Sequence, residues 1–130
     1  MSEGDKVRLV RPDDRVEADP TPGIVRERAF DSDGFWAGYV RTAPGMTSGW
    51  HHHGDYDTAI YVVDGNLRIE SGPGGSEVVT AVVGDFVHVS KGAIHREGNS
   101  GKEESHLVIV RTGYGVPTIN VDGPEPEIDE

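Results

Sequence analysis

The sequence predicts an all-β protein built as a closed antiparallel barrel or jelly roll, and three observations support this. Short apolar runs rich in β-branched and aromatic residues recur about every 8–12 residues. The 18 Gly and 8 Pro residues supply turn signals between these runs. No stretch of useful length shows helical periodicity, and there is no internal repeat. Closure into a barrel would also remove the edges that so many apolar strands would otherwise expose.

Six apolar runs are predicted to form strands in the middle of the chain. The first is aromatic and is ended by Pro44-Gly45, and the second is apolar throughout and ends at Asp64-Gly65, a hairpin signal. The third alternates apolar and polar residues before a turn at 72–75, and the fourth ends at Gly84-Asp85. The six runs are residues 35–40, 58–63, 67–70, 78–83, 86–89 and 107–110.

A chain of 130 residues is long enough to bury one hydrophobic core, so a single domain over residues 1–130 is expected. Its core should span about residues 24–113. Residues 1–22 are expected to form an N-terminal arm, in which 7–10 could be a short edge strand because prolines lie nearby. Residues 114–130 should form an acidic tail that frays from 123 onward.

Composition excludes several functional classes. The chain has no Cys, which excludes disulfides, thiolate metal sites and cysteine nucleophiles. The net charge of −11 should repel nucleic-acid phosphates and anionic lipid headgroups, so neither nucleic acid nor membrane is an expected partner. The first residues lack the features of a secretory signal, and no apolar run is long enough to span a bilayer. A soluble cytoplasmic protein is the expectation.

The histidines carry the clearest chemical signal. In an extended strand, His51 and His53 would point to the same side and His52 to the other, so two imidazoles could hold one ion. A third ligand must come from elsewhere, and His95 lies in a turn-rich segment. Neutral imidazole suits several divalent metals, which here leaves Fe, Mn, Zn and Ni open. The alternative is a set of surface histidines without an ion.

The residues around these histidines strengthen the metal hypothesis. The stretch Gly45-x5-His51-x-His53, followed by an apolar strand and Gly65, resembles the first signature of the cupin superfamily. The stretch Gly84-Asp85-x4-Ser90-x-Gly92-x2-His95-x3-Asn99 resembles the second, with Ser90 in place of the usual proline. The two motifs cover close to half the chain. The resemblance implies a small single-domain cupin: a double-stranded β-helix with the metal ligands pointing inward.

The resemblance also implies a glutamate between the histidine pair and the closing glycine, which this sequence lacks. Counting from His53 places Asp57 there, and counting back from Gly65 places Thr58 there. These neighbours should face opposite sides of the strand, so only one can point at the ion. A three-histidine site is favoured, with Asp57 as a possible fourth ligand if a bulge turns it inward.

Several further side chains are candidates for the cavity around the ion. Packing in the barrel wall is the plainer role for each aromatic residue. Arg96 could hold a substrate carboxylate, although Arg96 and Glu97 are expected at the rim. Besides Arg96, the candidate pocket residues are Tyr61, His88 and His106, with Trp50, Tyr56 and Phe86 as other aromatic candidates.

Three protein ligands would leave positions on the metal for water, substrate or dioxygen. The hypothesis is therefore a metal-dependent enzyme acting on a small oxygenated organic molecule, of dioxygenase, isomerase, cyclase or lyase type. The alternatives are a non-enzymatic ligand-binding or regulatory module and a purely structural barrel. The resemblance also implies a homodimer, formed by paired sheets or by exchange of an N-terminal strand, for which residues 7–10 are the candidate.

Overall fold

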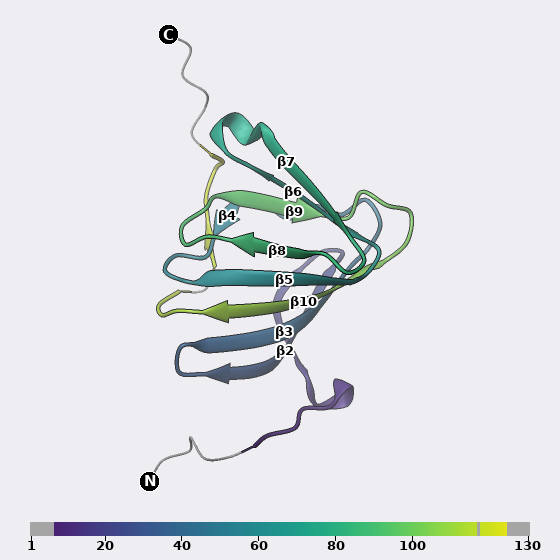
Figure 1. The fold of residues 1–130 in the computed structure, drawn as a ribbon, viewed down its shortest axis with the longest axis vertical. Helices are drawn as coiled ribbons and strands as arrows, with labels where there is room; N and C mark the ends of the chain where they lie inside the picture. Colours follow the sequence, from purple (N-terminus) through teal and green to yellow (C-terminus); the bar gives the residue numbers. More distant parts are fainter. Residues whose placement is uncertain (1–6, 117, 125–130) are drawn as a thin grey trace.

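Eleven strands form two antiparallel sheets in the computed structural model, which describes residues 7–116 and 118–124. Figure 1 shows the strands of the larger sheet side by side and the hairpin of β6 and β7 beyond them. The larger sheet has the order β1 (Val16–Thr21), β2 (Ile24–Ser32), β3 (Phe35–Thr42), β10 (Ser105–Thr112), β5 (Asp57–Asp64), β8 (Phe86–Val89). The smaller sheet has the order β11 (Ile119–Asn120), β4 (His51–His52), β9 (His95–Gly98), β6 (Asn66–Ser71), β7 (Glu77–Val82).

Alternation along the strands directs one face of each sheet into a common core. In β10, every second residue from Ser105 to Arg111 is buried, and the residues between them lie on the outer face. β3 and β5 show the same alternation, with Val40 and Ile60 in the core. The core joins both sheets and comprises Ile24, Trp36, Val40, Ile60, Val62, Leu67, Ile69, Ala81, Val89, Leu107 and Ile109. The all-β prediction is confirmed.

The structure adds strands at both ends of the predicted core. β1 and β2 pair with each other, so residues 16–21, assigned to the arm, belong to the larger sheet. β11, assigned to the tail, pairs with β4. Residues 7–10 form no strand, which contradicts the predicted edge strand there. Most of the tail segment expected to fray, from 125 onward, lies outside the described residues.

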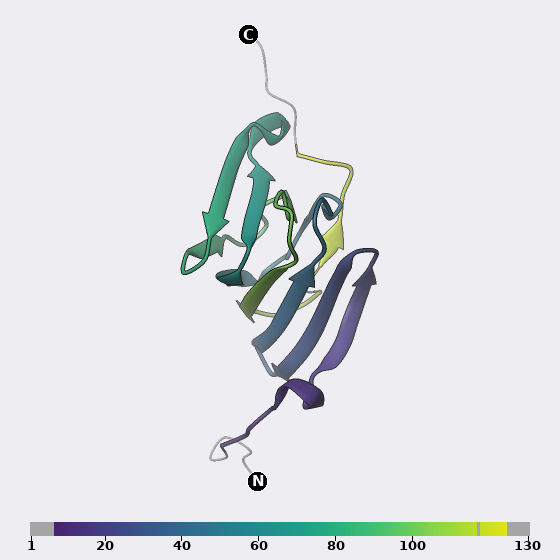
Figure 2. The ribbon, with the colours of Figure 1, turned by 90° about the vertical axis from the view of Figure 1, so that its right-hand side faces the viewer.

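The Asp64-Gly65 turn does not close a hairpin as predicted. β5 and β6 lie in different sheets, so this turn carries the chain from one sheet to the other. Gly65 has φ of +76°, and an added Cβ would come within 2.9 Å of the Cα of Ser105, so both conformation and space require glycine. By contrast, β6 and β7 are true hairpin partners (Figure 2).

In the part of the chain that the structure describes, no helix has the length and hydropathy to cross a bilayer. The helical content there is confined to two 3-10 turns, η1 (Pro12–Asp14) and η2 (Pro73–Gly75). Neither turn has a buried residue, so the strands alone build the core.

Candidate metal centre

Pairing of the two histidine-bearing segments brings the three predicted ligands together. His51 in β4 lies directly opposite His95 in β9. The same antiparallel alignment continues before β4, where Ser48 N donates to the carbonyl of Glu97 at 2.7 Å and Thr47 bridges to Gly98. Two segments more than 40 positions apart in the sequence therefore run side by side, as the sequence hypothesis requires.

His51, His53 and His95 form one buried group whose candidate ligand atoms all lie within 4.8 Å of one another. The three residues are at most 5% exposed, and their ring centroids are 4.4–5.1 Å apart. His52 points away, as alternation predicts, and its Nδ1 accepts a hydrogen bond from Gly54 N at 3.0 Å. The three imidazoles thus converge and the fourth does not.

Backbone carbonyls fix the tautomers of two of these rings. His51 Nδ1 lies 2.8 Å from the carbonyl oxygen of Gly49, and His95 Nδ1 lies 2.9 Å from that of Ala93. A carbonyl only accepts, so each Nδ1 must donate its proton, which leaves the Nε2 of the neutral ring with a free lone pair. His95 Nε2 is buried without a hydrogen-bond partner among the described residues. This donor set fits a divalent ion.

A carboxylate predicted at the rim, that of Glu97, lies beside these rings. Glu97 follows His95 by two residues in β9, so both side chains point to the same face. Its Oε1 is 3.9 Å from His51 Nε2, its side chain is only 12% exposed, and its Oε2 is buried with no hydrogen-bond partner in the described part of the chain. The alternation rule that paired His51 with His53 would also have identified Glu97.

Burial and charge set the protonation of this group. Burial lowers the pKa of His51 below its ordinary value of 6.5, although Glu97 and the carbonyl of Gly49 act in the opposite direction. Burial by itself would raise the pKa of Glu97, but Arg26 and the adjacent histidines in their protonated forms outweigh it and hold that pKa below its ordinary value. The site therefore favours a neutral His51 next to an ionised Glu97, the forms in which both can face a cation.

Acidification is expected to destabilise the metal-free protein through His51. Its pKa is lowered in the folded state, while the unfolded chain keeps the ordinary value of 6.5. Between these two values the unfolded state binds more protons, so the free energy of unfolding should fall as the pH drops through this window. Urea unfolding at about pH 7.5 and about pH 5.5 measures the difference. This difference in the free energy of unfolding between the two pH values should shrink in His51→Gln and persist in His88→Gln. Equal differences in both variants would contradict the assignment of the pH dependence to His51.

The structure does not bring Asp57 to the histidines. Thr58 is 1% exposed and points into the barrel, so its neighbour Asp57 points outward, where its carboxylate lies 3.1 Å from His88 Nε2. No bulge is recorded at this end of β5 in its pairing with β8 or β10. Asp57 and Thr58 were the two candidates for the place of the expected glutamate, and of these Thr58 faces inward. This placement argues against Asp57 as a fourth ligand.

The side chains of the four candidate pocket residues lie on the outer faces of the barrel. They alternate along their strands with residues whose side chains point inward. The four are Tyr61, His88, Arg96 and His106. Tyr61 packs against Phe86 with centroids 4.8 Å apart, and Phe86 is 76% exposed. Arg96 pairs with Glu70 at 2.9 Å and stacks on Trp50 at 4.6 Å. His88 contacts Asp57, as described above, and is 64% exposed. These placements correct the expectation that they line the metal cavity.

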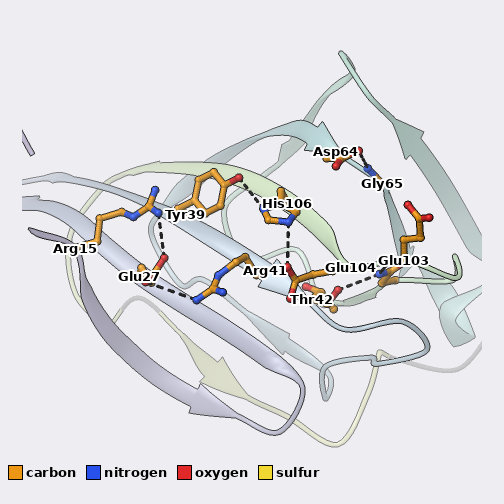
Figure 3. A network of polar contacts seen from close by, with 11 residues as sticks. Arg15, Glu27, Tyr39, Arg41, Thr42, Asp64, Gly65, Glu103, Glu104 and His106 are labelled. Atoms are coloured by element: carbon orange, nitrogen blue, oxygen red, sulfur yellow. Dashed lines mark hydrogen bonds and ion pairs between the residues drawn. The ribbon is translucent and has the colours of Figure 1, made fainter. Parts of the chain in front are cut away.

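His106, the fourth of these candidates, belongs to a polar network on the outer face of the larger sheet (Figure 3). Tyr39 Oη lies 2.8 Å from His106 Nδ1, and His106 Nε2 lies 3.0 Å from Glu104. Arg15 continues the network by stacking on Tyr39 and pairing with Glu27 at 3.3 Å. This arrangement gives His106 partners away from the core.

Comparison with known proteins agrees with this geometry. The family model described as "Cupin domain" matches residues 38–111, a segment that contains all three histidines. No curated protein sequence matches the chain.

Solved structures show the same fold at low sequence identity. KdgF from Halomonas sp. superposes with a TM-score of 0.71 at 20% identity, covering 83% of this chain and 96% of that one. The polyketide cyclase RemF from Streptomyces resistomycificus gives 0.73 at 18% identity, covering 89% and 86%. The CENP-C cupin domain of Drosophila melanogaster gives 0.68 at 18% identity, covering 80% of each chain. These likenesses confirm the double-stranded β-helix.

Proposed function

The chain belongs to the cupin family, and from that premise we propose that it binds one divalent metal ion through His51, His53 and His95 and acts as a metal-dependent enzyme on a small oxygenated organic molecule. The observation that carries the proposal is the convergence of three buried imidazoles, two of which have Nδ1 engaged by a backbone carbonyl. Such bonds orient metal-ligating histidines and select the nitrogen that binds.

Each residue of the site has a distinct task in this proposal. The ion would polarise a substrate oxygen as a Lewis acid or, if it is a redox metal, exchange electrons; Fe, Mn, Zn and Ni remain candidates. Gly49 and Ala93 hold the rings of His51 and His95 in place through their carbonyls. Glu97 would offset the positive charge of the ion, since its Oε1 lies 3.9 Å from His51 Nε2.

Ser48 supports this arrangement from the paired segment. Its hydroxyl accepts a hydrogen bond from Glu97 N at 3.1 Å and donates to the carbonyl of Gly49 at 2.9 Å. One buried side chain therefore links the strand that bears Glu97 to the carbonyl that orients His51. This linkage supports a site that is formed before the ion arrives, which reduces the cost of ordering on binding.

A non-enzymatic ligand-binding or regulatory module remains the alternative. The chain resembles RemF, a polyketide cyclase, and the CENP-C cupin domain to a similar degree, with TM-scores of 0.73 and 0.68. It also superposes on part of oxalate decarboxylase from Bacillus subtilis, with a TM-score of 0.68 at 17% identity and covering 29% of that chain. One fold thus hosts different functions, and the site must decide between them.

Turnover assays separate these alternatives. We expect the metal-loaded protein to convert a small oxygenated substrate in one of two screens: oxygen uptake with Fe(II), or isomerisation and elimination of carbonyl compounds with Zn(II) or Mn(II). A chelator should abolish the activity and the same metal should restore it. Stoichiometric metal binding without turnover in either screen would favour the ligand-binding module.

Two further expectations stay predictions. A homodimer formed through the larger sheet is supported by the exposed Phe86 and Val63 at its surface, whereas residues 7–10 form no strand that could be exchanged. A cytoplasmic location is supported only by composition.

A further inference from the structure

A polar cavity of about 300 Å³ adjoins the histidine group. His51 forms part of its wall, so a molecule in the cavity would lie against one of the proposed metal ligands. The other lining residues come from β1, β2, β11 and the segments before β4 and β11. The lining residues are Thr21, Arg26, Ser48, Gly49, His51, Thr118 and Asn120; we call this cavity the anion subsite.

Arg26 provides the one full positive charge among these lining residues. It follows Ile24 by two positions in β2, and because Ile24 is 3% exposed in the core, alternation directs Arg26 to the same inner side. Its Nη1 donates a hydrogen bond to Thr21 Oγ1 at 2.7 Å, which fixes the guanidinium at the cavity wall. A guanidinium presents two parallel N–H donors that match the two oxygens of a carboxylate.

A count of charges around the cavity favours an anion once metal is bound. Arg26 and Glu97 both lie near His51 and carry opposite formal charges. A divalent cation held by three neutral imidazoles would raise the local net charge to about +2. This positive region would lie within a chain whose net charge is −11, so attraction of anions would be confined to the site.

We propose that the anion subsite binds the carboxylate of a small hydroxy or oxo acid through Arg26, with the hydroxyl or keto oxygen directed toward the histidines. The hydroxyls of Thr21 and Thr118 and the amide of Asn120 line the same cavity and provide further polar contacts. This inference rests on the proposed function, because it names the substrate class for the same site.

Lactate and its neutral amide, lactamide, test the charge requirement. We expect the Mn(II)-loaded protein to bind lactate and to bind lactamide about 10-fold more weakly, as measured by NMR titration with paramagnetic broadening of the methyl signal. Arg26→Gln should raise the Kd for lactate about 10- to 100-fold, since a hydrogen bond to a charged group is lost. Arg41→Gln is the matched control, because Arg41 lies on the outer face of β3 and pairs with Glu27.

The outcomes separate this inference from the proposed metal function. If metal does not bind, the proposed function fails, and lactate titration of metal-free wild type and Arg26→Gln still decides whether Arg26 binds carboxylate. If metal binds but Arg26→Gln keeps the wild-type Kd, or lactamide binds as tightly as lactate, the inference is overturned. Binding of phosphate in place of lactate would overturn the carboxylate assignment. Should Arg26→Gln fail to fold, Arg26→Lys takes its place and should still weaken lactate binding, because lysine lacks the paired donors.

Discussion

His95→Ala is expected to abolish stoichiometric binding of a divalent metal. His95 is 1% exposed, its Nδ1 contacts the carbonyl of Ala93, and its Nε2 faces the group formed with His51 and His53. Loss of one of three ligands should lower metal affinity by more than about 100-fold, because removal of an outer-shell partner alone typically costs 10- to 100-fold. Calorimetric titration of metal-free protein with Zn(II) or Mn(II) measures this loss.

His52→Ala is the matched control for this prediction. His52 is adjacent to two proposed ligands in sequence, but its ring points away from them and its Nδ1 accepts from Gly54 N. This variant should keep one ion per chain with an affinity near that of the wild type. Protein purified without a nickel resin avoids metal acquired from the column. Equal affinities in His95→Ala and wild type would refute the three-histidine site.

Glu97→Gln is expected to weaken metal binding about 10-fold or more while leaving the fold intact. Glutamine preserves the shape of the side chain but removes the negative charge that lies 3.9 Å from His51 Nε2. In a site of low exposure, such a charge stabilises a cation more than it would in water. The comparison is the Kd for Mn(II) in wild type and variant, with the free energy of unfolding of both metal-free proteins as a check on the fold.

Glu70→Gln provides the control for Glu97→Gln. Glu70 lies in β6 and pairs with Arg96 on the outer face, away from the histidine group, and that pairing holds the pKa of Glu70 below its ordinary value. Because this pair lies on the outer face and makes no contact with the histidine group among the described residues, its loss should leave the metal Kd within about twofold of the wild type. A Glu97→Gln protein that binds Mn(II) as tightly as the Glu70→Gln protein would show that the buried carboxylate plays no part in holding the ion.

Local sequence pattern predicted those features that depend on alternation within one strand. The common orientation of His51 and His53, and the opposite orientation of His52, follow from the two-residue period of extended chain and are found in the structure. The same period decides between Asp57 and Thr58 once the buried side of β5 is known. It also places Glu97 on the same face as His95, in contrast to the predicted rim position.

Local sequence pattern could not predict the features that depend on pairing between distant segments. β4 and β9 are short and polar, and they exist as strands because they pair with each other, with β6 or with β11. The charged sequence of β2 does not stand out as a strand, yet it pairs with β3 over most of its length. The pocket candidates Tyr61, His88, Arg96 and His106 were misplaced because sequence alone does not reveal which face of each strand is buried.

A crystal structure of the metal-loaded protein, with anomalous diffraction recorded on both sides of the metal absorption edge, tests whether the three histidines hold the ion. We expect one anomalous peak per chain within bonding distance of the Nε2 atoms of His51 and His95 and of a ring nitrogen of His53, about 2.0–2.1 Å for zinc. A fully occupied peak elsewhere, or none after loading with Fe, Mn, Zn or Ni, would contradict the three-histidine site.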